Sequence, residues 1–396
     1  MIRRLAAGAL ITSVGNGAWY TSWAVFLTRS VGLSPAEVGV GMTLAGGAGI
    51  LAATPLGHLA DRVGPREVFG ALQVARAAAC LAYLAVDGPV VFAAVACLGG
   101  VAGASGGARN ALVCGLTTED ERMRVLGTIR SLNHLGWAVG AAVGALIIGI
   151  DSRSGYVGLL VLDAASFLAY AVAIAGVPRV APVARGEHGL RLTVLRDRPY
   201  VSLAAMMGVL SLCWGMLSSG VPLWVALHTD APRPVSAVIV LLNSLAIAAF
   251  QIRVSTAIRS PLGAARGALW AGSALAASCV VFALTDGLGG ATAVALLLAG
   301  GALHVAGELL FVAASWGLSI PLMPPDAAGQ YQGMFATGEA AAQMLAPALM
   351  TTLVAGWGQP GWLVLAALFV LATAPALPAT RWALAQRRGP EAMTQS

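Results

Sequence analysis

Twelve apolar runs of about 20 residues follow one another along this chain of 396 residues, and about 20 apolar residues in a helix cross the hydrocarbon core of a bilayer. Only 10% of the residues are charged and 58% are hydrophobic, which excludes a soluble globular protein. We therefore predict an all-α membrane protein with 12 transmembrane helices. The expected spans are 5–27, 38–59, 68–86, 90–114, 125–150, 157–177, 201–227, 235–254, 263–284, 291–318, 333–355 and 361–377.

The arginines indicate how these spans are oriented. An even number of spans puts both termini on one side of the membrane. Most arginines lie in the termini and in the loops that share their side, whereas the opposite loops hold Arg29, Arg153 and Arg233. Because basic residues favour the cytoplasmic side, we expect both termini to be cytoplasmic in a multi-pass protein of the cell membrane. We also expect the first span to stay in the mature protein, because it has full transmembrane length.

The longest polar connection divides the spans into six plus six. A weak internal repeat supports this division, because a shift of 206 residues lays Gly127, Asn133 and Gly140 over Gly333, Glu339 and Ala346. We predict two pseudo-symmetric halves. The expected parts are an N-terminal six-helix half over 1–178, a cytoplasmic linker over 179–199, a C-terminal six-helix half over 200–380 and a cytoplasmic tail over 381–396.

A short polar loop between the second and third spans reads Gly57-His-Leu-Ala-Asp61-Arg62-Val-Gly64-Pro-Arg66. It resembles the Gly-x-x-x-Asp-Arg-x-Gly-x-Arg signature loop of the major facilitator superfamily of secondary transporters. The resemblance implies the major facilitator fold, with a substrate path between two halves that alternate in access. It also implies a cytoplasmic latch, in which Asp61 would pair with Arg109 and would cap the eleventh span. The latch residues would be Gly57, Asp61, Arg62, Gly64, Arg66 and Arg109.

Ionisable residues inside spans are the candidates for chemistry, because lipid makes them costly unless they are paired or used. Glu308 lies near the middle of the tenth span, with His304 one turn before it. A carboxylate there resembles the arrangement in some proton-coupled multidrug exporters. The segment Gly329-Gln-Tyr-Gln-Gly333 resembles the entry to the eleventh span in bacterial drug-exporter-like members. The alternative is a structural Glu308, satisfied by His304 or by a facing helix.

Two further residues join the proton-coupling candidates, Glu339 in the eleventh span and His134 in the fifth. Glu339 suits a proton carrier, a substrate contact or a brace to Arg130 or Asn133. His134 titrates near neutrality, although a lone histidine is more often simply hydrogen-bonded. The fifth span also carries a glycine every four residues, at Gly136, Gly140 and Gly144, which predicts close packing of a neighbouring helix.

Aromatic and amide side chains on the expected inner helices are the candidates for a substrate cavity. Such residues in an apolar cavity suit amphiphilic cargo. In the first span they recur at helical spacing on one expected face, although Trp19 to Trp23 also suits an interfacial belt. For Arg76 and Asp163, in the third and sixth spans, a structural ion pair between them or with polar neighbours is favoured over a transport role. The cavity candidates are Asn16, Trp19, Tyr20, Trp23, Asn133, Trp214, Asn243 and Gln343.

The sequence lacks a phosphate-binding loop, a nucleophile triad and metal-ligand spacing, so we predict that the protein is not an enzyme and needs no cofactor. We predict a secondary active transporter that is monomeric in its bilayer, with a small-molecule substrate and protons as partners and with no nucleic acid. The leading hypothesis is proton-coupled export of small amphiphilic compounds, a drug or a natural product. The alternatives are an uptake carrier or facilitator for a small polar metabolite and a non-transporting sensor on the same fold.

Overall fold

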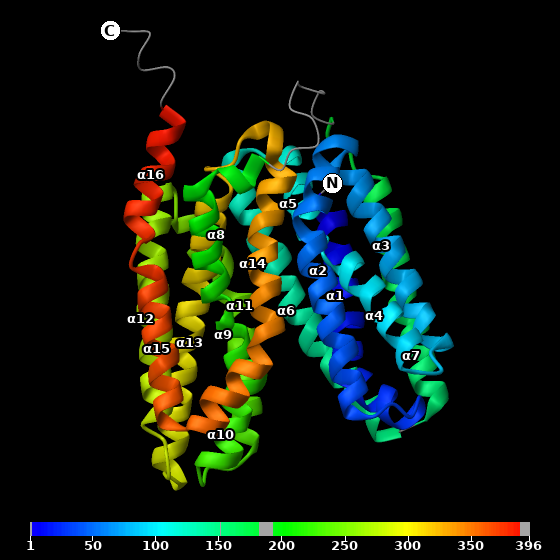
Figure 1. Ribbon diagram of the computed structural model, residues 1–396, viewed down its shortest axis with the longest axis vertical. Coiled ribbons are helices and arrows are strands. Elements are labelled where there is room, and N and C mark those ends of the chain that lie inside the picture. Colours follow the sequence, from blue (N-terminus) through cyan, green and yellow to red (C-terminus); the bar gives the residue numbers. More distant parts are fainter. Residues whose placement is uncertain (1, 151, 182–192, 389–396) are drawn as a thin grey trace. The chain divides into compact units, whose positions relative to one another are not determined.

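A computed structural model describes residues 2–150, 152–181 and 193–388, and these residues are largely helical (Figure 1). The chain divides into two compact units. Unit 1 comprises Met1–Leu192 with Pro324–Thr337, and unit 2 comprises Thr193–Met323 with Gly338–Ser396. Residues 182–192 of the expected linker and 389–396 of the expected tail lie outside the described residues. The helical content confirms the predicted all-α class.

Unit 1 holds a bundle of helices that runs from the N-terminus to Ala175 (Figure 1). Several of these helices start where the sequence supplies a start signal. Ser34 and Glu37 form a capping box at the second helix, and proline occupies the first turn of the second, third and fourth. The helices are α1 (Ile2–Val25), η1 (Phe26–Ser30), α2 (Pro35–Val63), α3 (Pro65–Ala82), η2 (Tyr83–Ala85), α4 (Pro89–Gly103), α5 (Gly106–Leu116), α6 (Glu119–Ile150) and α7 (Arg153–Ala175).

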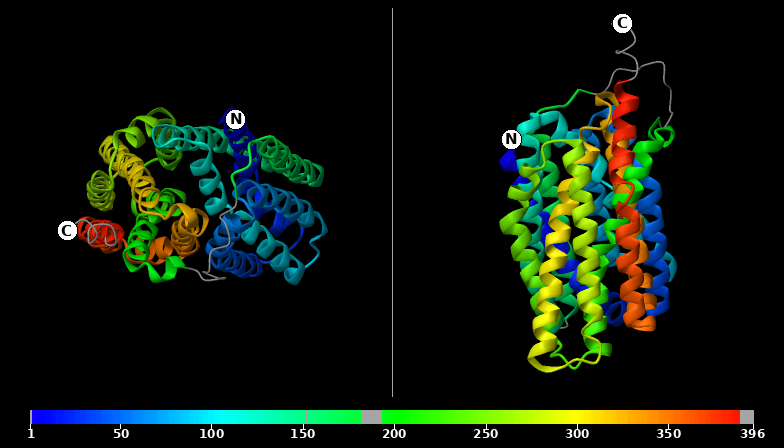
Figure 2. Two further views of the ribbon diagram at one scale, coloured as in Figure 1. Left: turned by 90° about the horizontal axis from the view of Figure 1, so that it is seen from above. Right: turned by 90° about the vertical axis from the view of Figure 1, so that its left-hand side faces the viewer.

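Most of the remaining helices belong to unit 2, and Figure 2 shows them from above and from the side. The helix at the expected tail continues to Arg388, across the boundary predicted at residue 380. The short helix η5 and the residues of α14 up to Thr337 are assigned to unit 1, and the rest of α14 is assigned to unit 2. The helices are η3 (Thr193–Arg196), α8 (Arg198–Leu210), α9 (Leu212–Gly215), η4 (Met216–Gly220), α10 (Val221–His228), α11 (Pro234–Ala257), α12 (Pro261–Ala283), α13 (Gly290–Ser319), η5 (Pro325–Ala327), α14 (Ala328–Leu349), η6 (Met350–Gly356), α15 (Gln359–Thr373) and α16 (Ala376–Arg388).

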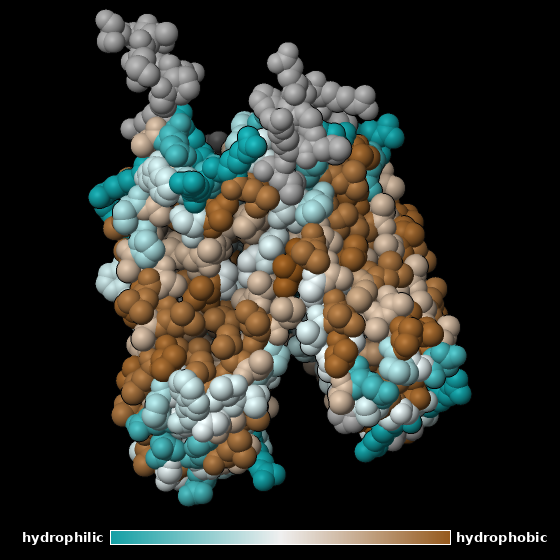
Figure 3. Space-filling model, viewed as in Figure 1, coloured by the Kyte–Doolittle hydropathy of each residue, from teal (hydrophilic) through white to brown (hydrophobic). Residues whose placement is uncertain are grey.

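Ten segments of the described chain are long and apolar enough to cross a membrane. They match ten of the twelve predicted spans, and some join consecutive helices, as α4 and α5 do within Pro89–Leu116. The remaining two predicted spans correspond to α1 and α14, which carry more polar side chains. In each unit apolar side chains cover the middle of the helices and polar ones gather at their ends (Figure 3). The chain is a multi-pass membrane protein, and its layout fits twelve spans.

The glycines of α6 bring this helix close to α1. A Cβ added at Gly140 would lie 2.1 Å from the carbonyl oxygen of Val14, and one added at Gly144 would lie 2.6 Å from that of Ala18. The contact is reciprocal, because a Cβ at Gly17 would lie 2.6 Å from the carbonyl oxygen of Trp137. Small residues allow such backbone approach where lipid supplies no hydrophobic effect between helices. The packing predicted from the glycine spacing is confirmed, and α1 is the partner.

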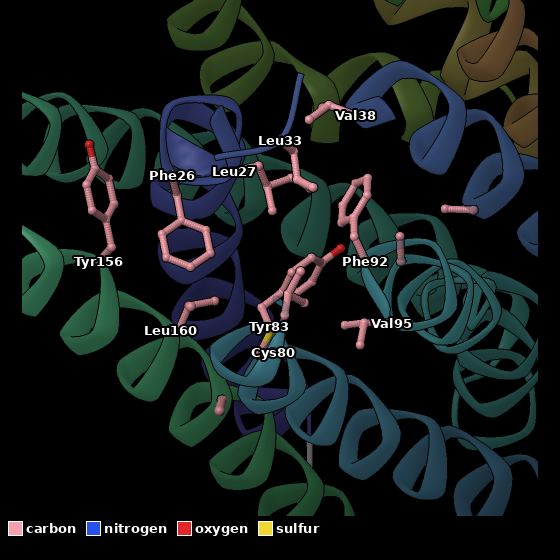
Figure 4. Close-up of a cluster of buried hydrophobic side chains, with 14 of the residues drawn as sticks. Phe26, Leu27, Leu33, Val38, Cys80, Tyr83, Phe92, Val95, Tyr156 and Leu160 are labelled. Carbon is pink, nitrogen blue, oxygen red and sulfur yellow. The ribbon is translucent and has the colours of Figure 1, made fainter. Parts of the chain in front are cut away.

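An apolar cluster fills unit 1 between α1, α3, α4 and α7 (Figure 4). Trp19 and Trp23 pack against this cluster, and the rings of Trp19 and Tyr83 lie 5.0 Å apart. Tyr20 is 59% exposed and contacts Trp137 of α6 instead, with ring centroids 5.2 Å apart. The prediction of one shared aromatic face on the first span is therefore wrong. Consecutive residues of a helix point about 100° apart, so Trp19 and Tyr20 meet different neighbours.

Candidate transport site

A buried carboxylate lies midway along α13 in unit 2. Glu308 is 1% exposed, and two neutral side chains donate hydrogen bonds to it. The indole Nε1 of Trp214 donates to Oε1 at 2.9 Å, and Nδ2 of Asn243 donates to Oε2 at 3.0 Å. The structure thus brings together residues predicted separately as a proton carrier and as substrate contacts. Neutral donors stabilise an anionic carboxylate without cancelling its charge.

His304 lies one turn before Glu308 and is fully buried. Its Nε2 is 2.9 Å from the carbonyl oxygen of Cys213 in α9, while Nδ1 has no hydrogen-bond partner among the described residues. The ring is also close enough to Glu308 to feel its charge. A buried polar nitrogen without a partner is costly, so Nδ1 of His304 is a group with unused hydrogen-bonding capacity beside Glu308.

The other proton-coupling candidates are less buried than Glu308. Glu339 lies on the part of α14 that belongs to unit 2 and is half-buried, and His134 is half-buried on α6 in unit 1. Gln343 is exposed. The described residues of unit 2 therefore place Glu308, His304, Trp214 and Asn243 in one cluster, with the backbone of Cys213 beside it.

Two amide candidates of unit 1 take part in contacts between helices. Oδ1 of Asn133 on α6 accepts a hydrogen bond from the Ser13 hydroxyl on α1 at 2.9 Å. Oδ1 of Asn16 accepts one from Nη2 of Arg76 on α3 at 2.8 Å. Both amides therefore hold α1 to its neighbours. Because they are half-buried, the structure also leaves part of each side chain accessible.

The signature loop holds the start of α14 within unit 1. Asp61 is 7% exposed, and its carboxylate accepts hydrogen bonds from the backbone N–H groups of Gly329 and Gln330, the latter at 2.9 Å. The first N–H groups of a helix have no partner within the helix, and an acidic side chain satisfies them while it favours the helix dipole. Asp61 therefore caps α14, which is the predicted eleventh span.

The expected ion pair between Asp61 and Arg109 is not formed among the described residues, so this prediction is wrong. Both oxygens of Asp61 already accept backbone hydrogen bonds. Nε of Arg109 lies 3.5 Å from Oδ1 of Asn110, and its charge acts on Arg76 and Tyr170 in the interior of unit 1. The helix dipole supplies the positive partner that the arginine was expected to supply.

The remaining loop residues have backbone roles as well as charges. Gly64 has φ of +117°, which separates α2 from α3 and favours glycine. Arg66 forms an ion pair with Glu67 at 2.9 Å and donates to the carbonyl of Val177 after α7 at 2.9 Å. Arg62 is exposed at the end of α2. The loop therefore connects α2, α3 and the end of α7.

The sequence analysis named Gly57 as a latch residue but missed the other glycines of this contact, which are Gly107, Gly329 and Gly333. A Cβ added at Gly57 would lie 2.0 Å from the carbonyl oxygen of Gly329, and one at Gly333 would lie 2.7 Å from that of Ala53. Gly107 of α5 also packs closely, because a Cβ added at Gly107 would lie 3.0 Å from the carbonyl oxygen of Gly329. The spacing of four between Gly329 and Gly333 is the sequence signal that points to close helix packing.

Solved structures with the same arrangement of helices are membrane transporters. A bacterial homologue of the iron transporter ferroportin, in its outward-facing state, matches with a TM-score of 0.74, 14% identity, and 97% of this chain and 99% of that chain covered. The proton:xylose symporter XylE matches with a TM-score of 0.71 and 13% identity, and the match covers 94% of this chain and 94% of that chain. The human organic anion transporter MFSD10 matches with a TM-score of 0.70 and 15% identity, and the match covers 95% of this chain and 98% of that chain. At such identities the likeness shows the fold.

The fold and the buried polar clusters define a membrane transporter of two helical units. The model of the Major Facilitator Superfamily matches residues 5–347, so the chain belongs to this superfamily. This confirms the resemblance that the signature loop carries. No curated protein matches the chain by sequence.

Proposed function

We propose that this protein is a secondary active transporter that couples proton movement to the export of small amphiphilic compounds by alternating access. Glu308 is the proton carrier, and His304 assists it. The single observation that carries this proposal is a carboxylate that is 1% exposed in the middle of a membrane helix and receives hydrogen bonds from two neutral side chains. Membership of the superfamily supports transport.

The chemistry of this site suits a proton carrier. When Glu308 is ionised, Trp214 and Asn243 stabilise its charge. When Glu308 binds a proton, it becomes a neutral group that costs far less to hold away from water. The two forms therefore differ strongly in how well the surrounding helices accommodate them. A ligand shifts a conformational equilibrium when it binds one conformation more tightly than the other. In this proposal the ligand is the proton that Glu308 binds.

The composition around the site favours an amphiphilic substrate. Trp214 is half-buried and its ring centroid lies 5.5 Å from that of Phe311, so aromatic surface adjoins the carboxylate. Asn243 adds an amide whose Oδ1 has no hydrogen-bond partner among the described residues. Aromatic surface with a few polar atoms is typical of pockets that bind partly apolar molecules. A cytoplasmic location of both termini completes the proposal, with export directed away from them.

The test is transport by the purified protein in liposomes that contain a pH-sensitive dye. Amphiphilic cations, neutral compounds and acids are added to the outside in turn, and luminal pH and solute content are followed together. We expect wild type to exchange at least one solute for protons. Glu308→Gln should abolish the proton movement, because glutamine keeps the size of the side chain and can still accept one of the two hydrogen bonds, but it does not gain and lose a proton as a carboxylate does.

The matched control is Glu37→Gln at the start of α2, where glutamine preserves the acceptor of the capping box. This variant should exchange solute and protons as wild type does. Solute transport without proton movement, equal in wild type and Glu308→Gln, would contradict the proposal and favour the facilitator. Failure of wild type to transport any solute would favour the non-transporting sensor.

A further inference from the structure

Unit 1 contains a guanidinium group within its helical bundle, in the middle of α3. Arg76 is half-buried, and among the described residues it donates one hydrogen bond, from Nη2 to Oδ1 of Asn16 at 2.8 Å. Its Cζ lies 4.3 Å from the centroid of the Phe167 ring, which covers one face of the guanidinium. An arginine has five N–H donors. Most of the hydrogen-bonding capacity of Arg76 is therefore unused by the protein.

The nearest carboxylate does not complete the site. Asp163 on α7 is 1% exposed, yet the ion pairs among the described residues do not join it to Arg76. Its Oδ2 accepts from the Cys80 thiol at 3.5 Å, and its Oδ1 lies 3.4 Å from the Ser166 hydroxyl. Asp163 acts on Arg76 by charge at longer range. Of the two arrangements that the sequence left open for Arg76 and Asp163, contacts with polar neighbours are the one that is formed.

Two nitrogens of Arg76 are unused. Nε and Nη1 have no hydrogen-bond partner among the described residues, and they are not among the buried polar atoms that lack one. They are therefore not fully enclosed by protein atoms. On the same helix, one turn earlier, Gln73 is 2% exposed and its Oε1 has no partner in the described part of the chain. Buried polar groups normally find partners, so this region is built for a further polar group.

The local charges favour an anion as that group. Arg109 on α5 is half-buried, and its positive charge also acts on Arg76. The charged groups that act on Arg76 are one aspartate and one arginine, so the three side chains together carry a net positive charge. An uncompensated charge inside a membrane protein is costly, and a bound anion would relieve that cost. The guanidinium fork also matches the geometry of a carboxylate.

We propose that Arg76 is a binding residue for the carboxylate of an amphiphilic substrate, with Asn16 positioning its guanidinium and Arg109 adding positive charge. Asp163 competes with the substrate for Arg76. This inference deepens the proposed function, on which it rests, by naming an acid as the class of substrate. The competition gives two opposite expectations, because loss of Arg76 should weaken binding of an acid and loss of the Asp163 charge should strengthen it.

The test is equilibrium binding of 2-naphthoate, with the neutral 2-naphthamide as its partner, to the full-length protein in phosphatidylcholine nanodiscs. Empty nanodiscs correct for partition into lipid. Wild type should bind the acid at least tenfold more tightly than the amide, since the neutral amide lacks the charge that pairs with the guanidinium. Arg76→Gln should lose this selectivity, Arg76→Lys should keep part of it, and Asp163→Asn should bind the acid more tightly than wild type.

Every variant is first checked for a single symmetric peak in size-exclusion chromatography. Equal binding of acid and amide by wild type would overturn the proposal, and so would unchanged acid binding in a well-folded Arg76→Gln. Binding is also measured in the Glu308→Gln background, where it should be retained. Acid selectivity in wild type together with a failure of wild type to exchange protons would refute the proton coupling and leave the anion site standing, so the two failures are distinguishable.

Discussion

The two units each bury a carboxylate in the middle of a helix, but they surround it differently. Asp163 in unit 1 and Glu308 in unit 2 are both 1% exposed. Asp163 has a thiol, a hydroxyl and the charge of Arg76 around it, whereas Glu308 receives hydrogen bonds from an indole and an amide. A nearby cation offsets a negative charge, and neutral donors only stabilise it. Burial alone therefore does not assign a role, because the neighbours decide what a carboxylate does.

The largest effect should come from displacing Asp163 while its charge is kept. A Cβ added at Gly15 would lie 2.0 Å from Oδ1 of Asp163, so Gly15→Ala forces the carboxylate or α1 to move. We expect a loss of stability of about 1–3 kcal/mol, as for other overpacked sites. Thermal unfolding in detergent measures it. Gly39→Ala is the matched control, because no atom lies within 4 Å of its added Cβ. Equal unfolding temperatures of the two variants would show that the Asp163 site is looser than described.

A smaller effect should come from Asp61, a third buried carboxylate, whose charge faces the start of a helix. We expect Asp61→Ala to lower stability by about 0.5–2 kcal/mol, as loss of a helix cap does. Asp61→Asn should lose less, because its amide oxygen still accepts one hydrogen bond from the start of α14. The measurement is thermal unfolding under the conditions used for Gly15→Ala. Identical losses in both variants would mean that the charge, and not the hydrogen bond, supports the helix start.

The smallest effect should come from removing one of the two donors to Glu308. Trp214→Phe deletes the Nε1–H group at 2.9 Å but keeps an aromatic ring. With one donor fewer, the carboxylate of Glu308 loses a hydrogen bond, so solute-driven proton exchange should slow by about tenfold or less, since one hydrogen bond contributes about 0.5–1.5 kcal/mol. The rate of luminal pH change in liposomes measures this effect. An unchanged rate would contradict the assignment of Trp214 as a donor to the carboxylate.

The sequence predicted the all-α class and most of the membrane spans, because each of these depends on the residues of one continuous segment. Apolar runs predicted the spans, and the polar loop from Gly57 to Arg66 predicted the superfamily, which the match over residues 5–347 confirms. The glycine spacing of the fifth span predicted tight packing, and α1 provides it. The aromatic face expected on the first span is wrong, because Trp19 and Tyr20 have different neighbours.

The predictions of particular partners were less successful. Asp61 caps α14 but does not pair with Arg109. For Arg76 the sequence left open whether Asp163 or a polar neighbour is the partner, and the structure shows Asn16. In a membrane helix the face toward lipid and the face toward other helices are both apolar, so the pattern of apolar residues does not fix the rotation of the helix. Pairings that depend on that rotation escape a sequence analysis.

By itself, the sequence determined that this chain forms helices in a membrane, because in lipid every backbone group must be satisfied within its own segment. It also determined which few ionisable residues the bilayer must accommodate. Only the tertiary structure decided their partners. Glu308 meets Trp214 and Asn243 across 94 and 65 residues of sequence, and such contacts exist only after the helices have packed. The residue types limit which reactions and contacts are possible, and the packing of the helices decides which of them are formed.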